Sequence, residues 1–392
     1  MRVLIIATGI APRMGGVGHC ERQLLPHLAA RLTASGCHVT VLLSRDGRLS
    51  HLDARAKVVR LPVSRNPGIL RILAENLYIP ALSFQADVTV ALDHRFPLLP
   101  VRVPRTLVVV HDVLPLQQRA GEHPSDTNSV RRWQYCLTIT RAIKAADDLV
   151  ADSQFTASQI GRFFPAAGRV SVIPLGIDHE RFHPFRETGE IERLRRFYGL
   201  PAEFYLFVGS LSLHKNLRLI VDTYSSGEVP ERFMLPVVVV GASRNDDPSN
   251  PALRLIDRTG IGTYFRFLGY IPDAHLPLLY AAARALIHPA WHEGFGLPPL
   301  EAMACGAPVI SSNRASLPEV VGDAALLIEP GSPNSLARAL QSVNDEDTRR
   351  QLIERGRRRA EAYSWQRTAE MMAKVICSAV QHHAWCAESE VR

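Results

Sequence analysis

Short apolar runs alternate with amphipathic stretches along most of the chain, which is the pattern of an α/β protein. In the first half, apolar runs predict strands at residues 3–8, 38–43, 58–63, 87–92, 106–111, 148–153 and 170–174. Between the first two runs, Leu24, Leu25, Leu28 and Leu32 recur at helical spacing. A strand, a glycine loop, a helix and a strand in this order predict the opening of a doubly wound parallel sheet.

The same pattern restarts in the second half, after the charged run 186–196. The strands predicted there cover residues 204–210, 237–241, 285–289 and 307–311. A chain of 392 residues is long enough for two domains of ordinary size. We therefore predict an N-terminal domain at residues 1–185 and a second one at 186–362.

The segment 292–306 combines a glycine loop with the start of a helix. Gly294 and Gly296 allow backbone amides to approach a ligand closely. Pro298 and Pro299 suit the first turn of a helix, where no amide donor is lost. The N-terminus of such a helix favours an anion.

Two carboxylates flank this anion-favouring loop. Glu293 belongs to the loop, and Glu301 comes about one turn into the helix. The arrangement suits a ligand with hydroxyls at both ends and phosphate in the middle, such as a nucleotide sugar. An ordinary loop and helix with two solvated glutamates is the alternative.

Residues 293–306 read EGFGLPPLEAMACG, and PVI follows at 308–310. This stretch resembles the E-x7-E signature of the retaining glycosyltransferases of family 4. The resemblance implies the GT-B fold, in which two Rossmann-like, doubly wound domains face a central cleft. The donor is expected on the second domain and the acceptor along the first. A helix at about 363–380 is expected to cross back onto the first domain.

The resemblance also implies roles for individual residues. Glu293 would hold hydroxyls of the transferred sugar, Glu301 the ribose, and Lys215 the pyrophosphate. The other positions implied to bind the donor are Gly15, Gly16, Ser210, Leu268, Tyr270, Gly294, Phe295, Gly296 and Leu297. Many members carry a second cation where this chain has Ser210 or His214, which leaves open whether His214 assists. An exposed lysine at a helix start is the alternative for Lys215.

His111 follows a buried-looking strand at the end where α/β sheets hold ligands. The resemblance implies that it contacts the transferred sugar and stabilises charge near the reacting carbon. It does not imply a general base, because the retaining reaction is generally written as front-face attack. Asp112 either orients the histidine or caps a loop. Ser153 either lies near the cleft or caps a helix.

Two other site types are weakly supported. Gly15, Gly16 and Gly18 do not follow the G-x-G-x-x-G spacing, and Asp46 is a poor match to a ribose-binding acid, so an NAD enzyme is disfavoured. The D-x-D motif at 345–347 does not follow an apolar strand and is expected to be a solvated helix start. The GT-B resemblance also implies a reaction without a metal, so no metal and no cofactor are expected.

The donor and acceptor are predicted only by class. The pattern from Val208 to Asn216 resembles the mannosyltransferase branch that serves polysaccharide assembly, which makes GDP-mannose the first donor and a UDP-sugar the second. A saccharide or lipid-linked saccharide is the expected acceptor. A GT-B epimerase or phosphorylase is the rival enzyme class, and the E-x7-E pair argues against it. A non-catalytic nucleotide-sugar-binding protein is the remaining alternative.

Charge and cysteine usage bear on location and partners. Residues 1–185 carry 22 Lys and Arg against 14 Asp and Glu, which suits anionic lipid or a phosphate-bearing acceptor. No zinc-finger spacing or RNA-binding signature points to nucleic acid. The pattern at 69–82 predicts a helix, with Arg65 and Arg71 beside it. This helix either lies on a lipid surface or packs on its own sheet.

The six cysteines are scattered, which predicts reduced thiols, and no apolar run reaches the roughly 18 residues of a membrane span. A cytoplasmic protein is expected, with peripheral contact at the inner face of the membrane as a further expectation.

Overall fold

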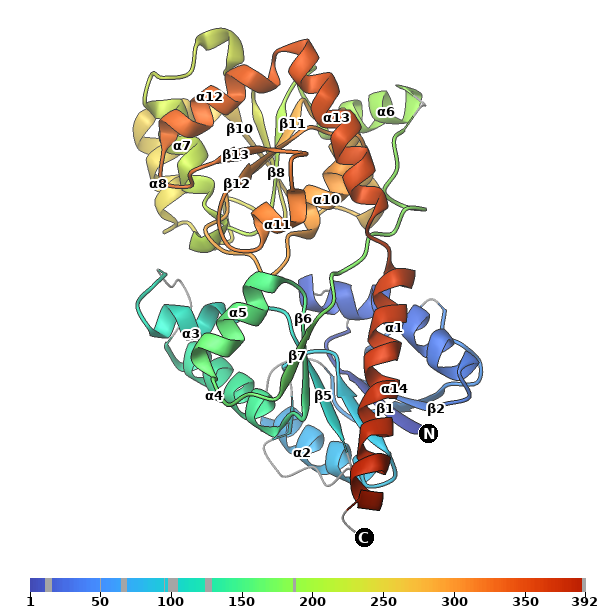
Figure 1. Ribbon diagram of the computed structural model, residues 1–392. Helices are drawn as coiled ribbons and strands as arrows, with labels where there is room; N and C mark the ends of the chain where they lie inside the picture. Colours follow the sequence, from blue (N-terminus) through green and yellow to red (C-terminus); the bar gives the residue numbers. More distant parts are fainter. Residues whose placement is uncertain are drawn as a thin grey trace. The chain divides into compact units, whose positions relative to one another are not determined.

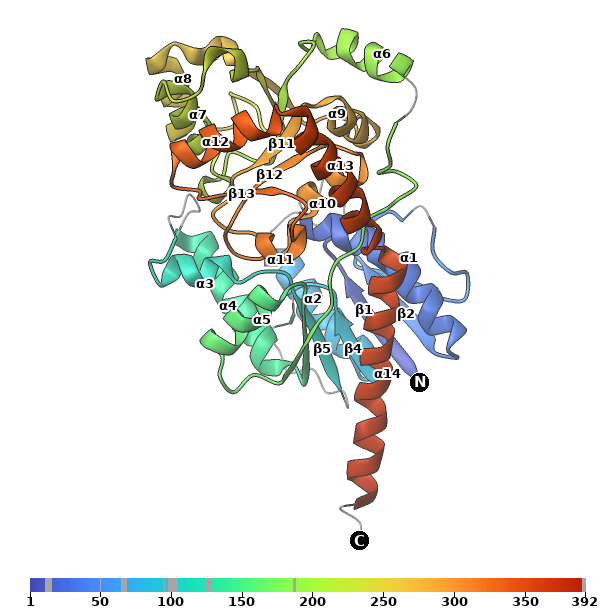
Figure 2. The same ribbon diagram turned by 45° about the horizontal axis from the view of Figure 1, so that its top comes forward.

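The structure is a computed structural model of the 392-residue chain (Figures 1 and 2). The residues that it describes are 1–10, 16–49, 51–64, 69–94, 96–97, 105–123, 129–185 and 188–389. The chain forms two compact units. The first comprises Met1–Ala120, Thr127–Gly176 and Ser364–Arg392, and the second comprises Gly121–Asp126 and Ile177–Tyr363.

The chain leaves the first unit after Gly176 and returns to it after Tyr363. These boundaries differ from those predicted from the sequence, at residues 185 and 362. The physical reason is a close approach of two chain segments within the first unit. A Cβ atom on Gly176 would lie 2.2 Å from the backbone nitrogen of Trp365. Only glycine fits at this point, so the two segments that belong to the first unit are packed together where the chain leaves it and returns.

The first unit is built on a seven-stranded parallel sheet with the order β3-β2-β1-β4-β5-β6-β7. Its strands are β1 Arg2–Ala7, β2 His38–Leu43, β3 Lys57–Arg60, β4 Val88–Ala91, β5 Thr106–Val110, β6 Asp148–Ala151 and β7 Arg169–Val172. The central strands β4 and β5 are buried along their whole length, as expected for a parallel sheet covered on both faces.

Helices cover both faces of this sheet. They are α1 Gly16–Ala34, α2 Ile69–Ser83, α3 Leu114–Arg119, α4 Ser129–Ala145, α5 Gln154–Phe163 and α14 Trp365–Ser389. Residues of α2, α4 and α5 share one hydrophobic cluster with the strands. The C-terminal helix α14 packs along α1, as both views show, and it buries Trp365, Met372 and Ile376 (Figures 1 and 2).

The second unit is built on a six-stranded parallel sheet with the order β10-β9-β8-β11-β12-β13. Its strands are β8 Tyr205–Val208, β9 Val237–Val240, β10 Phe265–Gly269, β11 Ala285–His288, β12 Val309–Ser312 and β13 Leu326–Ile328. Its helices are α6 Thr188–Tyr198, α7 Leu217–Ser225, α8 Pro251–Thr259, α9 Leu276–Ala282, α10 Leu297–Ala304, α11 Leu317–Val321, α12 Pro333–Val343 and α13 Glu346–Glu361. The structure thus confirms two Rossmann-like parallel-sheet domains, and the cleft between them stays a prediction.

In each sheet the strand order reverses its direction at one point, and this point decides where ligands bind. Strand order runs outward in opposite directions from β1 and β4 in the first sheet, and from β8 and β11 in the second. Ligands of open α/β sheets bind beyond the carboxyl ends of the strands at such switch points. The loops after β8 and β11 carry Lys215 and Glu293.

Candidate active site

The loop after β8 presents Lys215 on a single 3₁₀ turn, Leu213–Lys215. Asn216 ends this turn in the left-handed region, with φ of 60°, and begins α7. Its buried amide nitrogen donates to the carbonyl of Pro289 at 2.9 Å and to that of Pro330 at 2.8 Å. One side chain therefore ties together the loops that follow β8, β11 and β13.

The glycine loop after β11 is held in a similar way. Gly296 has φ of +112°, a conformation that favours glycine, and α10 begins directly after it. The hydroxyl of the fully buried Ser316 lies 2.9 Å from the carbonyl oxygen of Glu293 and 2.7 Å from that of Phe295. The loop is also joined to the lysine turn, because the backbone nitrogen of Trp291 donates to the carbonyl of His214 at 2.8 Å.

These two loops bring Lys215 and Glu293 into direct contact. The Lys215 Nζ lies 2.5 Å from Oε1 of Glu293, and Nε2 of His288 lies 2.8 Å from the same oxygen. Burial alone would raise the pKa of Glu293. The charge of Lys215 and the hydrogen bond from His288 outweigh it and hold that pKa well below its usual range. The loop carboxylate is ionised at neutral pH.

Glu301, the second glutamate of the motif, has the opposite surroundings. It is buried in α10, and the hydroxyl of Tyr280 donates to its Oε2 at 3.0 Å. Burial raises the pKa of Glu301 to about 7, and the Tyr280 hydrogen bond and the charge of Arg181 reduce that rise. This carboxyl group is therefore present in both protonation states near neutrality.

The remaining predicted donor-binding positions of the second unit surround the same edge. Ser210 follows β8, and its hydroxyl lies 3.0 Å from that of Ser212, so it stabilises its own turn. Leu268 lies at a register shift in the pairing of β10 with β9. The Tyr270 side chain, directly after β10, is 86% exposed. Their contact with a donor stays a prediction, as does that of the backbone from Gly294 to Leu297.

In the first unit, His111 follows β5 and is held at both ring nitrogens. Nδ1 lies 2.6 Å from Oδ2 of Asp152, and Nε2 lies 2.9 Å from the carbonyl oxygen of Leu92. Both partners are acceptors, so both nitrogens must carry a proton. Burial would lower the pKa of His111, but the charge and hydrogen bond of Asp152, with the charges of Asp93 and Glu21, raise it to about 9. His111 is an imidazolium with no nitrogen available as a base.

Two alternatives left open by the sequence are decided by these contacts. Asp112 caps a turn, because its Oδ1 accepts from the backbone nitrogen of Leu114 at 3.0 Å, and Asp152 is the residue that orients His111. Ser153 is the N-cap of α5, where its hydroxyl accepts from the backbone nitrogen of Thr156.

The glycine loop of the first unit is described only in part. Gly15 lies outside the described residues. Gly16 opens α1, and a Cβ atom there would meet no atom within 4 Å, so this glycine is not needed for packing. Its proposed contact with the donor stays a prediction.

Further expectations concern metal, thiols and membrane spans. Asp345 is the N-cap of α13, accepting from the backbone nitrogen of Thr348, which confirms the D-x-D motif as a helix start. Within the described ranges, no group of His, Cys, Asp or Glu has the arrangement of a metal site. The cysteines with described side chains form no disulfide. In the same part of the chain, no helix has the length and apolar character of a membrane span.

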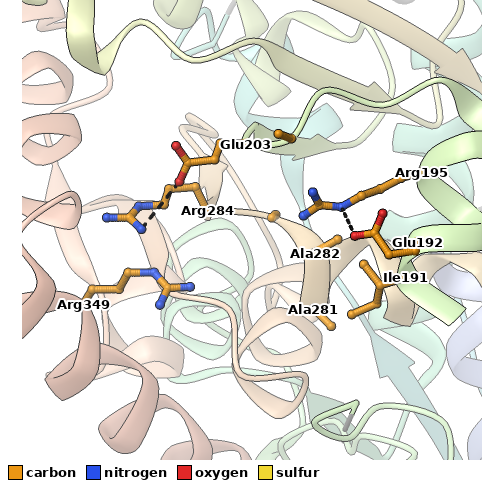
Figure 3. A pocket seen from close by; sticks show the side chains of 10 residues that line it. Ile191, Glu192, Arg195, Glu203, Ala281, Ala282, Arg284 and Arg349 are labelled. Atoms are coloured by element: carbon orange, nitrogen blue, oxygen red, sulfur yellow. Dashed lines mark ion pairs between the residues drawn. The ribbon is translucent and has the colours of Figure 1, made fainter. Parts of the chain in front are cut away.

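A cavity of about 310 Å³ lies elsewhere in the second unit (Figure 3). Arg195, Arg284 and Arg349 line it, and Glu192 and Glu203 lie beside the first two (Figure 3). Glu203 and Arg284 precede β8 and β11, so the cavity lies at the amino edge of the sheet. None of the predicted site residues lines it, and the carboxyl-edge loops remain the candidate site.

Sequence reasoning missed several residues of this site. His288 ends β11 and Asp152 follows β6, so each lies at the carboxyl end of a strand, which is the signal that identified His111. Asn216 and Ser316 gave no comparable signal, because their partners are backbone carbonyls of distant loops.

Comparison with known proteins connects this geometry to a family. Residues 22–181 match the family model described as Glycosyltransferase Family 4, and residues 191–359 match that of Glycosyl transferases group 1. The O-antigen chain mannosyltransferase B of Escherichia coli is 34% identical over 271 residues, which are 68% of this chain and 69% of that protein.

Two further likenesses extend over almost the whole chain. The GDP-mannose-dependent alpha-(1-6)-phosphatidylinositol dimannoside mannosyltransferase of Mycobacterium tuberculosis is 26% identical over 401 residues, covering 96% of both chains. The structure of a sucrose-phosphate synthase from Thermosynechococcus elongatus superposes with a TM-score of 0.73 and 22% identity, over 96% of this chain and 98% of that one. The chain is a glycosyltransferase of family 4, with the GT-B fold, and belongs to its mannosyltransferase branch.

Proposed function

We propose that this enzyme transfers a hexose, with mannose favoured, from a nucleotide sugar to a saccharide or lipid-linked saccharide in glycan assembly. GDP-mannose is the favoured donor, and the sugar keeps its anomeric configuration. The contact between Lys215 and Glu293 carries this proposal. A cation and a carboxylate at one switch point suit the diphosphate and the sugar hydroxyls on the two sides of the bond that breaks.

Lys215, Glu293 and Glu301 each have a role in this reaction. Lys215 neutralises the charge that develops on the leaving nucleoside diphosphate. Glu293 is ionised, and its Oε2 makes no hydrogen bond to any described residue, so it can accept from sugar hydroxyls. Glu301 binds the ribose, and its carboxyl group can both donate and accept near neutral pH. Lys215 and the N-terminus of α10 would neutralise the phosphates, so the proposed reaction needs no metal.

His111 would contact the transferred sugar as a hydrogen-bond donor and a fixed cation, and not as a base. Both of its nitrogens carry protons and already donate, so a sugar hydroxyl would replace the carbonyl of Leu92 as the acceptor at Nε2. A fixed imidazolium stabilises negative charge without any proton transfer from the acceptor. This property supports front-face attack with retention.

The relatives' names support the choice of donor, since one is called GDP-mannose-dependent. The alternative is a UDP-sugar. The test is a calorimetric titration with GDP, UDP and ADP, with and without magnesium. Binding of GDP in preference to UDP, unchanged by magnesium, is expected. Preference for UDP would replace the donor, and binding of none of the three would contradict the site.

A transfer assay separates the enzyme from a binding protein, an epimerase or a phosphorylase. With GDP-mannose and a saccharide acceptor, we expect a new glycoside whose one-bond C1–H1 coupling in NMR shows the same anomeric configuration as the donor. Release of an altered free sugar nucleotide, or phosphate-dependent cleavage of the glycoside, would contradict transfer.

Helix α2 supports a further proposal, peripheral contact with an anionic membrane. Leu70, Leu73 and Leu77 share one helical face and are 73%, 59% and 68% exposed. Arg71, expected beside a lipid-facing stripe, is instead buried, with its Nε donating to Glu75 at 2.8 Å. The helix therefore buries Arg71 together with Ala74 and Ile79 and leaves an apolar stripe outside, on a half of the chain with excess positive charge.

Liposome flotation tests this contact. Vesicles with anionic lipid should carry the protein at low salt, and replacing Leu70, Leu73 and Leu77 by glutamine should reduce binding. Glutamine at the exposed Phe197 of α6 is the control. Equal binding to neutral and anionic vesicles, or none at low salt, would contradict the proposal.

A further inference from the structure

One oxygen of Glu293 carries both contacts of its carboxylate. Lys215 Nζ and His288 Nε2 both reach Oε1, at 2.5 and 2.8 Å. Because the carboxylate can only accept, the histidine donates from Nε2. Oε1 is the anchor of the side chain, and Oε2 is the oxygen available to a ligand.

The two donors differ in their freedom to move. His288 is 2% exposed and is the last residue of β11, which is paired on both sides by β8 and β12. The Lys215 side chain is 21% exposed, and its methylene groups lie over Gly209. A lysine stem rotates about four single bonds, whereas a buried imidazole on a central strand is fixed by its neighbours.

The proposed function requires Lys215 to interact with the donor's diphosphate, and the present inference rests on that function. Once Lys215 does so, it no longer neutralises Glu293, whose side chain is only 13% exposed. A buried carboxylate that loses its charged partner tends to take up a proton unless another donor remains. A protonated Glu293 would hold sugar hydroxyls less strongly.

We propose that His288 is a positioning residue, whose Nε2–H keeps the Glu293 carboxylate in place and ionised while Lys215 exchanges Oε1 for a phosphate of the donor. Lys215 in the turn after β8 and His288 on β11 are the titratable groups that face Glu293 among the described residues. Among the described residues, no other titratable group therefore faces Glu293 when Lys215 turns away.

This role can be measured without any transfer reaction. GDP is titrated into each variant by calorimetry near pH 6, in buffers of different ionisation enthalpy, so that the protons taken up on binding are counted. His288→Leu removes the donor at similar size, and His288→Met is a second apolar replacement in case the first does not fold. His288→Gln keeps an N–H near the position of Nε2. His275→Leu, a histidine of the same unit that contacts Tyr198, is the control.

The expected result is proton uptake that depends on the hydrogen bond. His288→Leu and His288→Met should take up more protons per GDP than the wild type, up to one, because Glu293 protonates when Lys215 leaves it. GDP affinity should fall by about tenfold, the cost of leaving a buried charged group without its donor. His288→Gln and His275→Leu should match the wild type in both measurements.

Two outcomes would overturn this inference. Unchanged proton uptake and affinity in the apolar variants would show that His288 does not support Glu293. Equal defects in His288→Gln and His288→Leu would show that shape, not the hydrogen bond, matters. A wild type that binds neither GDP nor UDP would instead overturn the proposed function on which the inference rests.

Discussion

The carboxyl edges of the two sheets carry charges of opposite sign in matching arrangements. In the first unit a cation, His111, lies between the carboxylate of Asp152 and a backbone carbonyl. In the second unit an anion, Glu293, lies between Lys215 and His288. Each edge thus holds one buried charge with two partners at hydrogen-bond distance.

The difference in sign shows which protonation state each region maintains. The surroundings of His111 raise its pKa to about 9, so that it is a cation that cannot act as a base. The surroundings of Glu293 lower its pKa, so that it is an anion that cannot act as an acid. Glu301, which has a tyrosine but no cation at hydrogen-bond distance among the described residues, has a pKa of about 7. Direct partners, rather than burial alone, therefore decide which charge is permanent.

The largest expected effect comes from removing the anion of the second region. Glu293→Gln should lower kcat by about 10²- to 10³-fold, as loss of one preorganised electrostatic contact does in other enzymes. The change keeps the shape of the side chain, so the fold should survive. Steady-state kinetics with saturating donor is the measurement.

Glu329→Gln is the matched control, because Glu329 pairs with Arg314 at 2.6 Å and its side chain is 40% exposed. It should leave kcat unchanged. Full turnover by Glu293→Gln would remove the basis for contrasting the two edges.

The next largest effect concerns the rigidity of the second region. Asn216→Ala removes two hydrogen bonds to buried carbonyls and places alanine at φ of 60°. It should reduce the free energy of unfolding by about 2–3 kcal/mol and weaken GDP binding by loosening the Lys215 turn. Urea unfolding measures the first effect and calorimetry the second.

Asn216→Gly accepts the left-handed conformation but also lacks the amide, so it separates the two contributions. It should recover about 1 kcal/mol of the stability and none of the GDP affinity. Recovery of GDP affinity by the glycine variant would show that the carbonyl contacts do not position Lys215.

The cation of the first region is tested by Asp152→Asn. Because the pKa of His111 is raised from 6.5 to about 9, its stabilising contribution is complete below pH 6.5 and is lost as the pH rises through 9. The wild type should exceed the variant in unfolding free energy by on the order of 2 kcal/mol at pH 6, and the gap should close above pH 9. Chemical unfolding across this range measures it.

Asp112→Asn is the control for this pair, since Asp112 only caps a turn. Its stability difference from the wild type should not change between pH 6 and 9. A gap for Asp152→Asn that stays constant over the same range would mean that His111 is not a permanent cation.

The smallest effect is expected at Glu301. Its pKa is raised from 4.5 to about 7, so the wild type loses stability as the pH rises through this interval. Glu301→Gln has no such charge to bury and should be more stable than the wild type at pH 8 by about 1–2 kcal/mol, with the two equal near pH 4.5. Thermal unfolding at both pH values is the measurement, and parallel pH profiles would contradict the expectation.

Local pattern was sufficient to predict the elements of this fold, since strand 38–43 and the glycine loop with its helix follow from periodicity and proline placement. Strand order was not predictable in the same way. Lys215 and Glu293 were each placed beyond a strand, but their contact depends on β8 and β11 being neighbours, which is a property of the whole sheet.

Helix α2 shows a second limit of pattern reading. Its helical period was predicted correctly, but Arg71 and Glu75 turn inward and neutralise each other beside Thr8, leaving leucines exposed. A hydrophobic pattern identifies the two faces of a helix. It does not reveal that a charged pair will be buried on the inward face, beside Ala74 and Ile79, while leucines on the other face stay exposed.

The discontinuity of the first unit has a consequence for the order of events during synthesis. Helix α14, which packs along α1, follows the complete sequence of the second unit. A ribosome adds roughly 5–20 residues per second, so the surface of α1 that packs against α14 stays uncovered for many seconds. The second unit can fold while the first is still missing a helix, and the nascent chain would be most prone to aggregation in that interval.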